Sequence, residues 1–318
     1  MKRSALRFLV CPACRSEVEL SVHAERGPEI LEGVLSCRDC RANYPIRRGV
    51  ARFVGDGAYA ASFGRQWNWF RTVQLDSCSG TDESARTLRA TTGWTVTDYR
   101  GRLVLDAGVG AGRFADVVAR EGGEVVGIDL TDAIDAAYAN IGAHAGVHLV
   151  QADIFAMPFR EATFDLAYSI GVLHHTPDPA AAFRCVAATV KKGGGLAIYL
   201  YHRYGITRFS EAIRRVTTRL PSSVMLALSA LAIPAGPLYR TPLLGKVLQV
   251  GCPISGHPNW RWRWLDTFDW YTPRYQWKFL YPEVYAWFRA NGFHEIEIFD
   301  DPIRMRGIKT AEAIEVSR

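Results

Sequence analysis

The sequence LVLDAGVGAGRFA, residues 103–115, organises the interpretation of the whole chain. Its apolar start ends in Asp106, and Gly108, Gly110 and Gly112 follow at alternate positions before a helical pattern begins. These features predict a buried strand, a tight turn and the start of a helix. Glycine in such a turn permits a positive φ and lets a ligand lie on the backbone, while the first helical turn offers free N–H groups. We therefore expect a nucleotide-type ligand at this turn.

The spacing of the glycines narrows the class of ligand. A dinucleotide-binding turn needs its third glycine at the position that Arg113 occupies. The series Gly108-x-Gly110-x-Gly112 instead resembles the first motif of the class I methyltransferases, which bind S-adenosylmethionine (SAM). The resemblance implies that Asp106 and the three glycines form the site for the methionine end of SAM.

Three later segments extend the same resemblance. The sequences EVVGID at 124–129, VHLVQAD at 147–153 and FDLAYSI at 164–170 each predict a strand, and the first two end in an acid. An acid after the second strand is placed to accept hydrogen bonds from ribose hydroxyls. The resemblance implies these further cofactor contacts: Asp129 and Leu130 near the ribose, Asp153 and Ile154 beside the adenine, and Ile170 at the end of the fourth strand.

Alternating strands and helices predict the fold class. Strands are expected near 102–106, 124–129, 147–151, 164–170 and 194–201, with helices near 112–121, 132–143 and 178–190. This alternation predicts a parallel sheet covered on both faces. A helix over 283–291, a strand over 293–299 and a last strand near 308–314 complete, by resemblance, an α/β fold with a seven-stranded, doubly wound, Rossmann-like sheet.

Four of the seven cysteines form a separate N-terminal signal. Cys11-x-x-Cys14 and Cys37-x-x-Cys40 are separated by 22 residues, a spacing that predicts one tetrahedral structural Zn²⁺ held by four thiolates. A disulfide clamp would conflict with an unsecreted protein. The following YPIRRGV, residues 44–50, resembles the small zinc-ribbon proteins that partner and activate methyltransferases. Such a ribbon is here fused in cis.

The expected domain organisation has five parts. We place the zinc ribbon at 1–54, a helical cover at 55–98, the first part of the SAM-binding core at 99–204, a helical lid insertion at 205–265 and the rest of the core at 266–318. The first ten residues lack a secretory signal pattern, and no apolar run reaches 18 residues. A cytoplasmic protein without a transmembrane helix is expected.

The insertion carries most of the basic charge. Residues 205–265 contain eight Lys or Arg and one acid, Glu211. Apolar residues from Ile206 to Leu220 follow helical spacing, which predicts a basic amphipathic helix. Residues 222–233 form an apolar run that is either a buried lid helix or an interfacial one, so peripheral membrane contact through 206–233 stays open. The Trp/Arg alternation at 260–264 suits an acidic or aromatic substrate and equally a solvated strand.

Between ribbon and core, Phe63, Trp67 and Phe70 recur at i, i+4 and i+7, which predicts one helical face. This face packs on the core, or it closes over SAM, as a resemblance to SAM enzymes with an SFG-x-QW stretch implies.

The residues after the fourth strand bear on the acceptor. The sequence SIGVLHH at 169–175 lacks the Asn/Asp-Pro-Pro-aromatic motif of base-flipping amino methyltransferases, and it resembles enzymes that methylate carbon or oxygen of small molecules. His174 and His175 are candidate general bases, since an imidazole with a pKa of about 6.5 accepts a proton at neutral pH. In an extended segment only one would face the acceptor, and we favour His174.

Three functions follow from these patterns. The first is SAM-dependent methyl transfer to oxygen or carbon of a small, anionic or amphiphilic acceptor. The second is RNA methylation, because some rRNA guanine methyltransferases carry an N-terminal zinc ribbon and a Trp/Arg insertion suits base stacking; the weak net charge of a metallated ribbon counts against it. The third is a non-catalytic SAM-fold scaffold. No oligomeric state is predicted.

Overall fold

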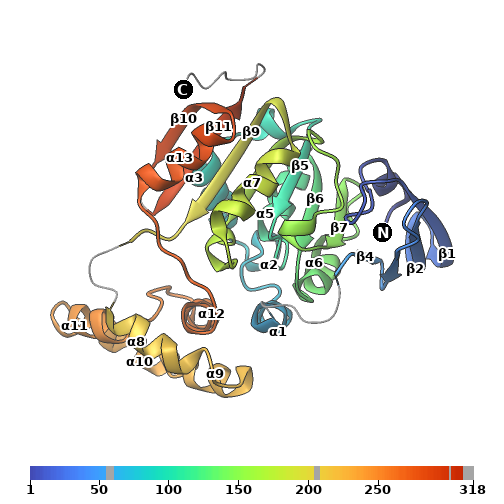
Figure 1. Cartoon of the computed structure of the whole chain (residues 1–318). Coiled ribbons are helices and arrows are strands. Elements are labelled where there is room, and N and C mark those ends of the chain that lie inside the picture. Colours follow the sequence, from blue (N-terminus) through green and yellow to red (C-terminus); the bar gives the residue numbers. More distant parts are fainter. Residues whose placement is uncertain (55–60, 204–207, 301, 311–318) are drawn as a thin grey trace.

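The computed structural model describes residues 1–54, 61–203, 208–300 and 302–310. Its centre is a continuous sheet in the order β1-β2-β3-β4-β7-β6-β5-β8-β9-β11-β10 (Figure 1). Five strands of the core pair in parallel: β5 Leu103–Ala107, β6 Glu124–Asp129, β7 Val147–Gln151, β8 Phe164–Ile170 and β9 Val190–Leu200. The bounds of the first four agree closely with the predicted ones, whereas β9 begins four residues earlier than predicted.

The sheet ends in an antiparallel hairpin. Strand β10 (Phe293–Phe299) has the predicted bounds, and β11 (Ile303–Lys309) pairs with both β9 and β10. The seven-stranded α/β core is therefore confirmed. The prediction for the last strand, 308–314, was wrong in position, because buried Ile303 and Met305 alternate with arginines and already form the strand pattern. Residues 311–314 lie outside the described residues.

Helices cover both faces of the core sheet. On one face, α3 (Glu83–Thr92), α5 (Arg113–Arg120) and α6 (Ala133–Ile141) bury a cluster that includes Val104. On the other, α7 (Pro179–Thr189) and α13 (Tyr281–Ala290) pack in a cluster that includes Leu105. Successive side chains of a strand point to opposite faces, so β5 contributes to both layers.

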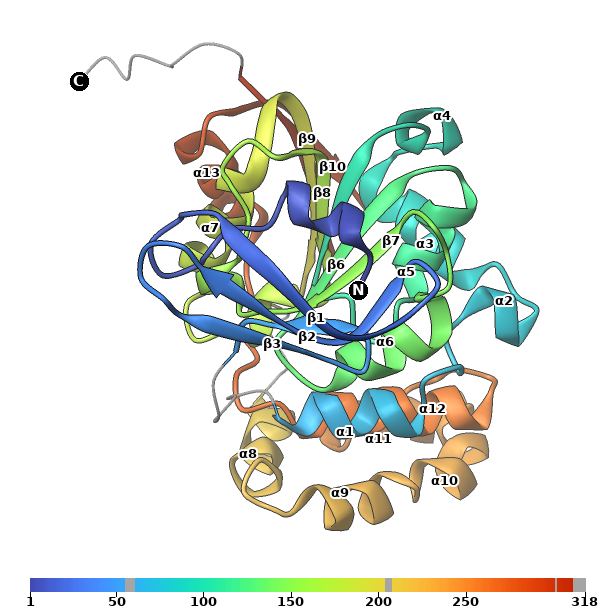
Figure 2. The same cartoon turned by 90° about the vertical axis from the view of Figure 1, so that its right-hand side faces the viewer.

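The N-terminal ribbon extends this sheet. It contains η1 (Arg3–Arg7), β1 (Val18–Arg26), β2 (Glu29–Cys37), β3 (Asn43–Arg47) and β4 (Val50–Arg52). Strand β4 pairs in parallel with β7, with Ala51 opposite Val150 and Arg52 opposite Gln151. Figure 2 shows the ribbon strands against the edge of the core. The cysteine-bearing segment and the core thus share one backbone hydrogen-bond network.

The insertion forms a separate helical layer below the sheet. It comprises α8 (Arg208–Thr217), α9 (Ser222–Ser229), α10 (Ala232–Tyr239), α11 (Leu244–Gly251) and α12 (Trp260–Tyr271). Helix α1 (Ala61–Trp69) lies beside α12 (Figure 2). Three short helices, α2 (Asp76–Ser79), α3 and α4 (Val96–Tyr99), lead from α1 to β5.

The Trp/Arg segment departs from the strand-like alternation that we considered. The Asn259 side chain accepts hydrogen bonds from the N–H groups of Arg261 and Trp262, which starts helix α12. Trp262 and Leu265 then lie buried on one side of the helix. The predicted domain boundary at residue 265 falls inside this helix, so α12 belongs as a whole to the insertion layer.

The expectation that no apolar run reaches 18 residues was also wrong. Helical residues Ser222–Tyr239 form an 18-residue window with a mean hydropathy of 1.4, long and apolar enough to cross a membrane by length and composition alone. The run is longer than predicted because it continues past Pro234, which lies in the first turn of α10, where proline is tolerated. Only 22% of the window is buried, so it is not the buried lid helix that was considered.

Candidate methyl-donor and acceptor site

The glycine turn after β5 needs glycine for conformation and for space. Gly108, Gly110 and Gly112 have φ values of +98°, +52° and +91°. A Cβ atom on Gly108 would lie 2.3 Å from a methyl group of Val172, and one on Gly112 would lie 2.7 Å from Ile141. Only glycine fits such positions, so the backbone of the turn stays free of side chains beside the ends of the strands.

A cavity of about 700 Å³ begins at this turn. It lies at the C-terminal ends of the parallel strands, where ligands bind in open α/β sheets. Six of the predicted cofactor residues line it: Gly108, Gly110, Asp129, Leu130, Ile154 and Ile170.

Asp129 connects the glycine turn to the end of β6. Its Oδ2 accepts from the N–H of Gly110 at 3.0 Å, and its Oδ1 accepts from the N–H and hydroxyl of Thr131 at 2.9 and 2.7 Å. A carboxylate offers about four acceptor positions. Asp129 therefore keeps capacity for a ribose hydroxyl at the cavity wall.

Three predicted cofactor residues do not line the cavity. Asp106 is only 2% exposed and accepts a hydrogen bond from the Tyr168 hydroxyl at 3.0 Å, and burial raises the pKa of its carboxyl to about 7. Asp153 accepts from the N–H of Phe155 and caps a short helical turn. Gly112 instead lies against Ile141. The predicted contacts of these residues with SAM stay predictions.

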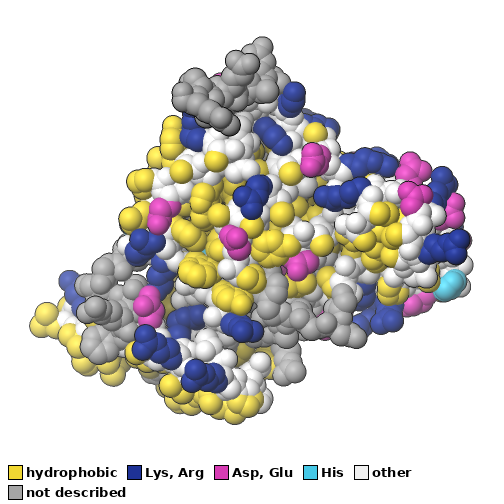
Figure 3. Space-filling view, in the orientation of Figure 1, with side chains coloured by type: hydrophobic (Ala, Val, Ile, Leu, Met, Phe, Trp, Pro, Cys, Tyr) yellow, Lys and Arg dark blue, Asp and Glu magenta, His cyan; other side chains and the backbone are white. Residues whose placement is uncertain are grey.

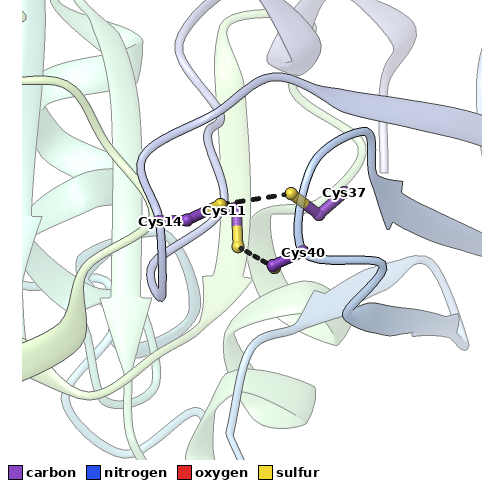
Figure 4. A group of neighbouring side chains, drawn as sticks. All are labelled: Cys11, Cys14, Cys37 and Cys40. Carbon is purple, nitrogen blue, oxygen red and sulfur yellow. Dashed lines mark hydrogen bonds between the residues drawn. The ribbon is translucent and has the colours of Figure 1, made fainter.

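The four ribbon cysteines meet at one point (Figure 4). Their sulfur atoms all lie within 4.8 Å of one another, with Cys11 to Cys40 at 3.6 Å and Cys14 to Cys37 at 3.3 Å. Zinc–sulfur bonds of about 2.3 Å place the corners of a tetrahedron about 3.8 Å apart, so the set fits one Zn²⁺. All four positions are filled by protein, which makes the site structural.

Comparisons with known proteins agree with both halves of this structure. A family model described as "Methyltransferase domain" matches residues 105–198, and a second, "Trm112p-like protein", matches residues 2–49. A malonyl-[acyl-carrier protein] O-methyltransferase of Pseudescherichia vulneris is 31% identical over 180 residues, which cover 56% of this chain and 67% of that protein. The chain belongs to the class I SAM-dependent methyltransferases.

Other similar proteins match shorter segments or the fold. A ubiquinone biosynthesis O-methyltransferase of Paracidovorax citrulli is 34% identical over 116 residues, 32% of this chain and 45% of that protein. The chain thus spans about half the length of the first curated relatives that it matches. A solved complex of the Haloferax volcanii Trm112 methyltransferase activator with a putative methyltransferase has 13% identity and a TM-score of 0.48, covering 80% of this chain and 100% of that one.

Helix α1 covers the part of the cavity next to the glycine turn. The Trp67 indole lies 3.2 Å from where a Cβ on Gly110 would be, and Gln66 is buried at the cavity wall. Phe70 packs instead with Trp262 of α12. The helical segment therefore packs against α12 and also covers the cavity. The Phe63 side chain lies outside the described residues.

The part of the cavity lined by α12 contains two carboxylates that our sequence analysis missed. Asp266 and Asp269 line the cavity from α12. Gln74 donates to Asp266 at 3.2 Å, and Gln66 donates to Asp269 at 3.3 Å. Burial raises the pKa of Asp266 to about 7 and that of Asp269 to about 6. Their i, i+3 spacing would have indicated one helical side, had this segment been recognised as a helix.

The cations of the site are tied to neighbouring groups. Arg113 donates to the Gln74 side chain at 2.8 Å. Arg214 of α8 donates to the backbone carbonyls of Trp270 and Pro273 at 2.8 and 2.6 Å. The insertion therefore presents both acids and a bound arginine to the cavity, and its exposed basic residues lie elsewhere.

The two histidines differ in position from our expectation. Residues Leu173–His175 form a 3-10 turn, so the alternation of an extended segment does not apply. His175 lines the cavity and its Nδ1 lies 2.7 Å from the Tyr275 carbonyl, whereas His174 is fully buried and stacks on Tyr201 with ring centres 3.9 Å apart. Burial lowers the pKa of both imidazoles, that of His175 to about 4. The preference for His174 was wrong in orientation, and the catalytic role of either residue stays a prediction.

Proposed function

We propose that this methyltransferase transfers the methyl group of SAM to an oxygen or carbon atom of a small-molecule acceptor. The observation that carries the proposal is the single cavity of about 700 Å³ shared by the glycine turn and α12. Its volume lies within the range of small-ligand pockets, about 300 to 1,000 Å³. The names of the relatives, O-methyltransferases of ubiquinone biosynthesis and of malonyl-acyl carrier protein, support the same reaction class.

The residues of the cavity suit this chemistry. SAM supplies a methyl group already activated on a sulfonium, so the protein chiefly binds, orients and excludes water. The glycine turn and Asp129 would hold the cofactor, and Trp67 covers it. His175 donates its Nδ1 proton to the Tyr275 carbonyl, which leaves Nε2 as the basic nitrogen of a neutral imidazole. This nitrogen would receive the proton of a hydroxyl or enol acceptor.

Of the three tryptophans at 260–264, Trp260 alone is exposed, at 51%, so this segment offers one stacking face and not the series of faces that the RNA alternative requires. Trp262 and Arg263 are only 7% and 5% exposed, and the Trp264 indole N–H donates to the Leu226 carbonyl at 2.9 Å. Stacking of unpaired bases needs exposed aromatic faces. The burial of these side chains supports a small acceptor over RNA.

A radiolabel experiment tests the proposal. SAM labelled in its methyl group is incubated with the full chain and, in separate arms, with metabolite extract, lipid extract and total RNA. We expect label in an extract arm, lost in Asp129→Ala and retained in Asp132→Ala, an exposed acid nearby. Label in RNA alone would overturn the small-molecule proposal. SAM binding without transfer in any arm would support the scaffold alternative instead.

A further inference from the structure

The outer helices of the insertion expose large apolar side chains. We call the following residues of α9 to α11 the apolar ridge; they are between 42% and 83% exposed: Val224, Leu228, Leu231, Leu243, Val247 and Val250. Figure 3 shows hydrophobic side chains along the lower and left margins of the molecule, over these helices. Isolated exposed leucines are ordinary, but a continuous apolar surface marks an interaction site.

The ridge lies beside the buried side of the same helical run and continues its apolar surface into solvent. Val224, Leu228 and Leu231 follow i, i+4 and i+7 spacing, so they share one side of the helical run. About a quarter turn round the helix from this side, Met225 is 3% exposed and packs with Phe268 of α12. The helix is therefore apolar on the side that meets the protein and apolar again on the side that meets solvent.

Exposed cations belong to the same helical layer as the ridge, and one of them, Arg261, lies over the ring of Trp260. Five exposed basic residues belong to this layer: Arg215, Arg219, Arg240, Lys246 and Arg261. In the part of the chain that the structure describes, none of them forms an ion pair with a carboxylate. Since Glu211 is the only acid between residues 205 and 265, the layer is complementary to a negatively charged partner.

A hollow of about 330 Å³ lies among the same helices. Arg240 and Lys246 line it, together with Thr241 and Gln249. The Thr241 hydroxyl and the Gln249 amide already donate to the carbonyls of Leu238 and Ile254, so the hollow offers chiefly its two cations, close in sequence to the exposed Leu243. This combination suits an anionic headgroup whose acyl chains meet the ridge.

We propose that α8 to α11 form a membrane-binding surface that lies on a bilayer containing anionic lipids. An amphipathic helix in the interface buries its apolar side among the acyl chains and keeps its cations at the headgroups. The inference goes beyond the proposed function, because it concerns where the protein sits and does not depend on methyl transfer.

The attachment of α9 and α10 to α12 favours lying on the membrane over crossing it. The Trp264 indole donates to the Ser229 hydroxyl at 3.0 Å, and Arg263 donates to the Ile233 carbonyl at 3.3 Å. A spanning helix would have to leave these contacts. Since α12 lines the cavity, the surface also places the acceptor site directly behind the membrane-facing layer.

Vesicle flotation with the full chain tests the surface. The probes are phosphatidylcholine vesicles with and without phosphatidylglycerol, at low and high salt. We expect flotation with phosphatidylglycerol and weaker binding at high salt. The double variant Leu231→Glu/Leu243→Glu should bind at least about tenfold more weakly, since each substitution removes a side chain that the bilayer would bury and adds an anion. The matched control is Ile298→Glu, a 54% exposed apolar residue on β10, which should bind like the wild type.

The remaining outcomes distinguish other occupants of the ridge. Thermal unfolding and SAM titration confirm that each variant is folded, so loss of flotation in a misfolded variant is not counted. No flotation with either vesicle, together with a dimer in light scattering that the leucine variants abolish, would overturn the proposal in favour of a second copy. Binding of total RNA that depends on Arg215 and Arg219, without flotation, would overturn it in favour of RNA.

Discussion

The guanidinium of Arg52 lies 2.7 Å from the side-chain oxygen of Gln151, and this buried hydrogen bond joins the zinc ribbon to the methyltransferase core. The Gln151 amide in turn donates to the carbonyl of Leu130 at 3.1 Å, and Leu130 lines the cofactor cavity. Arg52 also pairs with Asp135 of α6 at 2.7 Å. Through this chain of contacts the ribbon reaches the turn that follows Asp129.

Replacement of Arg52 by Met should therefore weaken SAM binding as well as the fold. Hydrogen bonds to charged groups contribute about 1.5 to 3 kcal/mol, so we expect a loss of about that size in the free energy of unfolding and a severalfold rise in the Kd for SAM. Denaturant titration and calorimetry measure the two. Arg48→Met is the matched control, because Arg48 is 75% exposed and pairs with the same Asp135 without contacting Gln151. Equal effects of both variants would contradict a specific path through Gln151.

Asp129→Ala should lower SAM affinity by roughly 30-fold or more, because it removes both the hydrogen bond expected to the ribose and the one that holds the Gly110 N–H of the cofactor turn, a loss of about 2 to 4 kcal/mol. Calorimetric titration of SAM gives the value, with Asp132→Ala as the exposed control. Unchanged affinity in Asp129→Ala would rule out this residue as the ribose ligand.

The buried Asp106 predicts a pH-dependent stability. Its pKa is raised from 3.8 to about 7, so between those values the folded chain binds more protons than the unfolded chain. The free energy of unfolding should therefore fall as pH rises from about 4 to 7, by an amount on the order of 3 kcal/mol from this group. Denaturant unfolding at several pH values measures the slope.

Two variants isolate the contribution of Asp106. Asp106→Asn should flatten the decline in stability over this pH range. Tyr168→Phe removes the hydrogen bond that favours the ionised carboxylate, so it should extend the decline to higher pH. An Asp106→Asn variant with the slope of the wild type would contradict the assignment.

His175→Ala should lower turnover on an identified acceptor by about 10²- to 10⁴-fold and leave SAM affinity unchanged, as expected for loss of a general base. His174→Phe keeps an aromatic ring against Tyr201 and should retain turnover. Because the pKa of His175 is lowered to about 4, its basic form is already complete at pH 6, and the rate should not change between pH 6 and 8 through this group. Wild-type turnover in His175→Ala would leave positioning alone to carry the reaction.

Metal analysis should find one zinc per chain. Cys40→Ser removes one of the four ligands, so it should reduce zinc content and lower the unfolding temperature. Cys78→Ser, at an exposed cysteine outside the cluster, should leave both unchanged. A zinc-free wild type with an unaltered unfolding temperature in chelator would contradict a structural metal.

Several features could be predicted from the sequence because they depend on neighbouring residues. The glycine turn, the ends of the core strands and the paired cysteines all follow from short spacings whose geometry the backbone itself imposes. The cavity residues next to the glycine turn, such as Gly110 and Asp129, lie in these local motifs.

The part of the cavity lined by α12 and the docking of the ribbon could not be predicted, because both depend on contacts between distant parts of the chain. Asp269 meets Gln66 only because α12 packs beside α1, and β4 meets β7 only because the ribbon docks on the sheet edge. The sequence by itself determined the SAM-type core and the zinc ligands. The tertiary structure alone decided which histidine lines the cavity and which face of the insertion stays exposed, because burial is set by the whole surrounding fold and not by the periodicity of one segment.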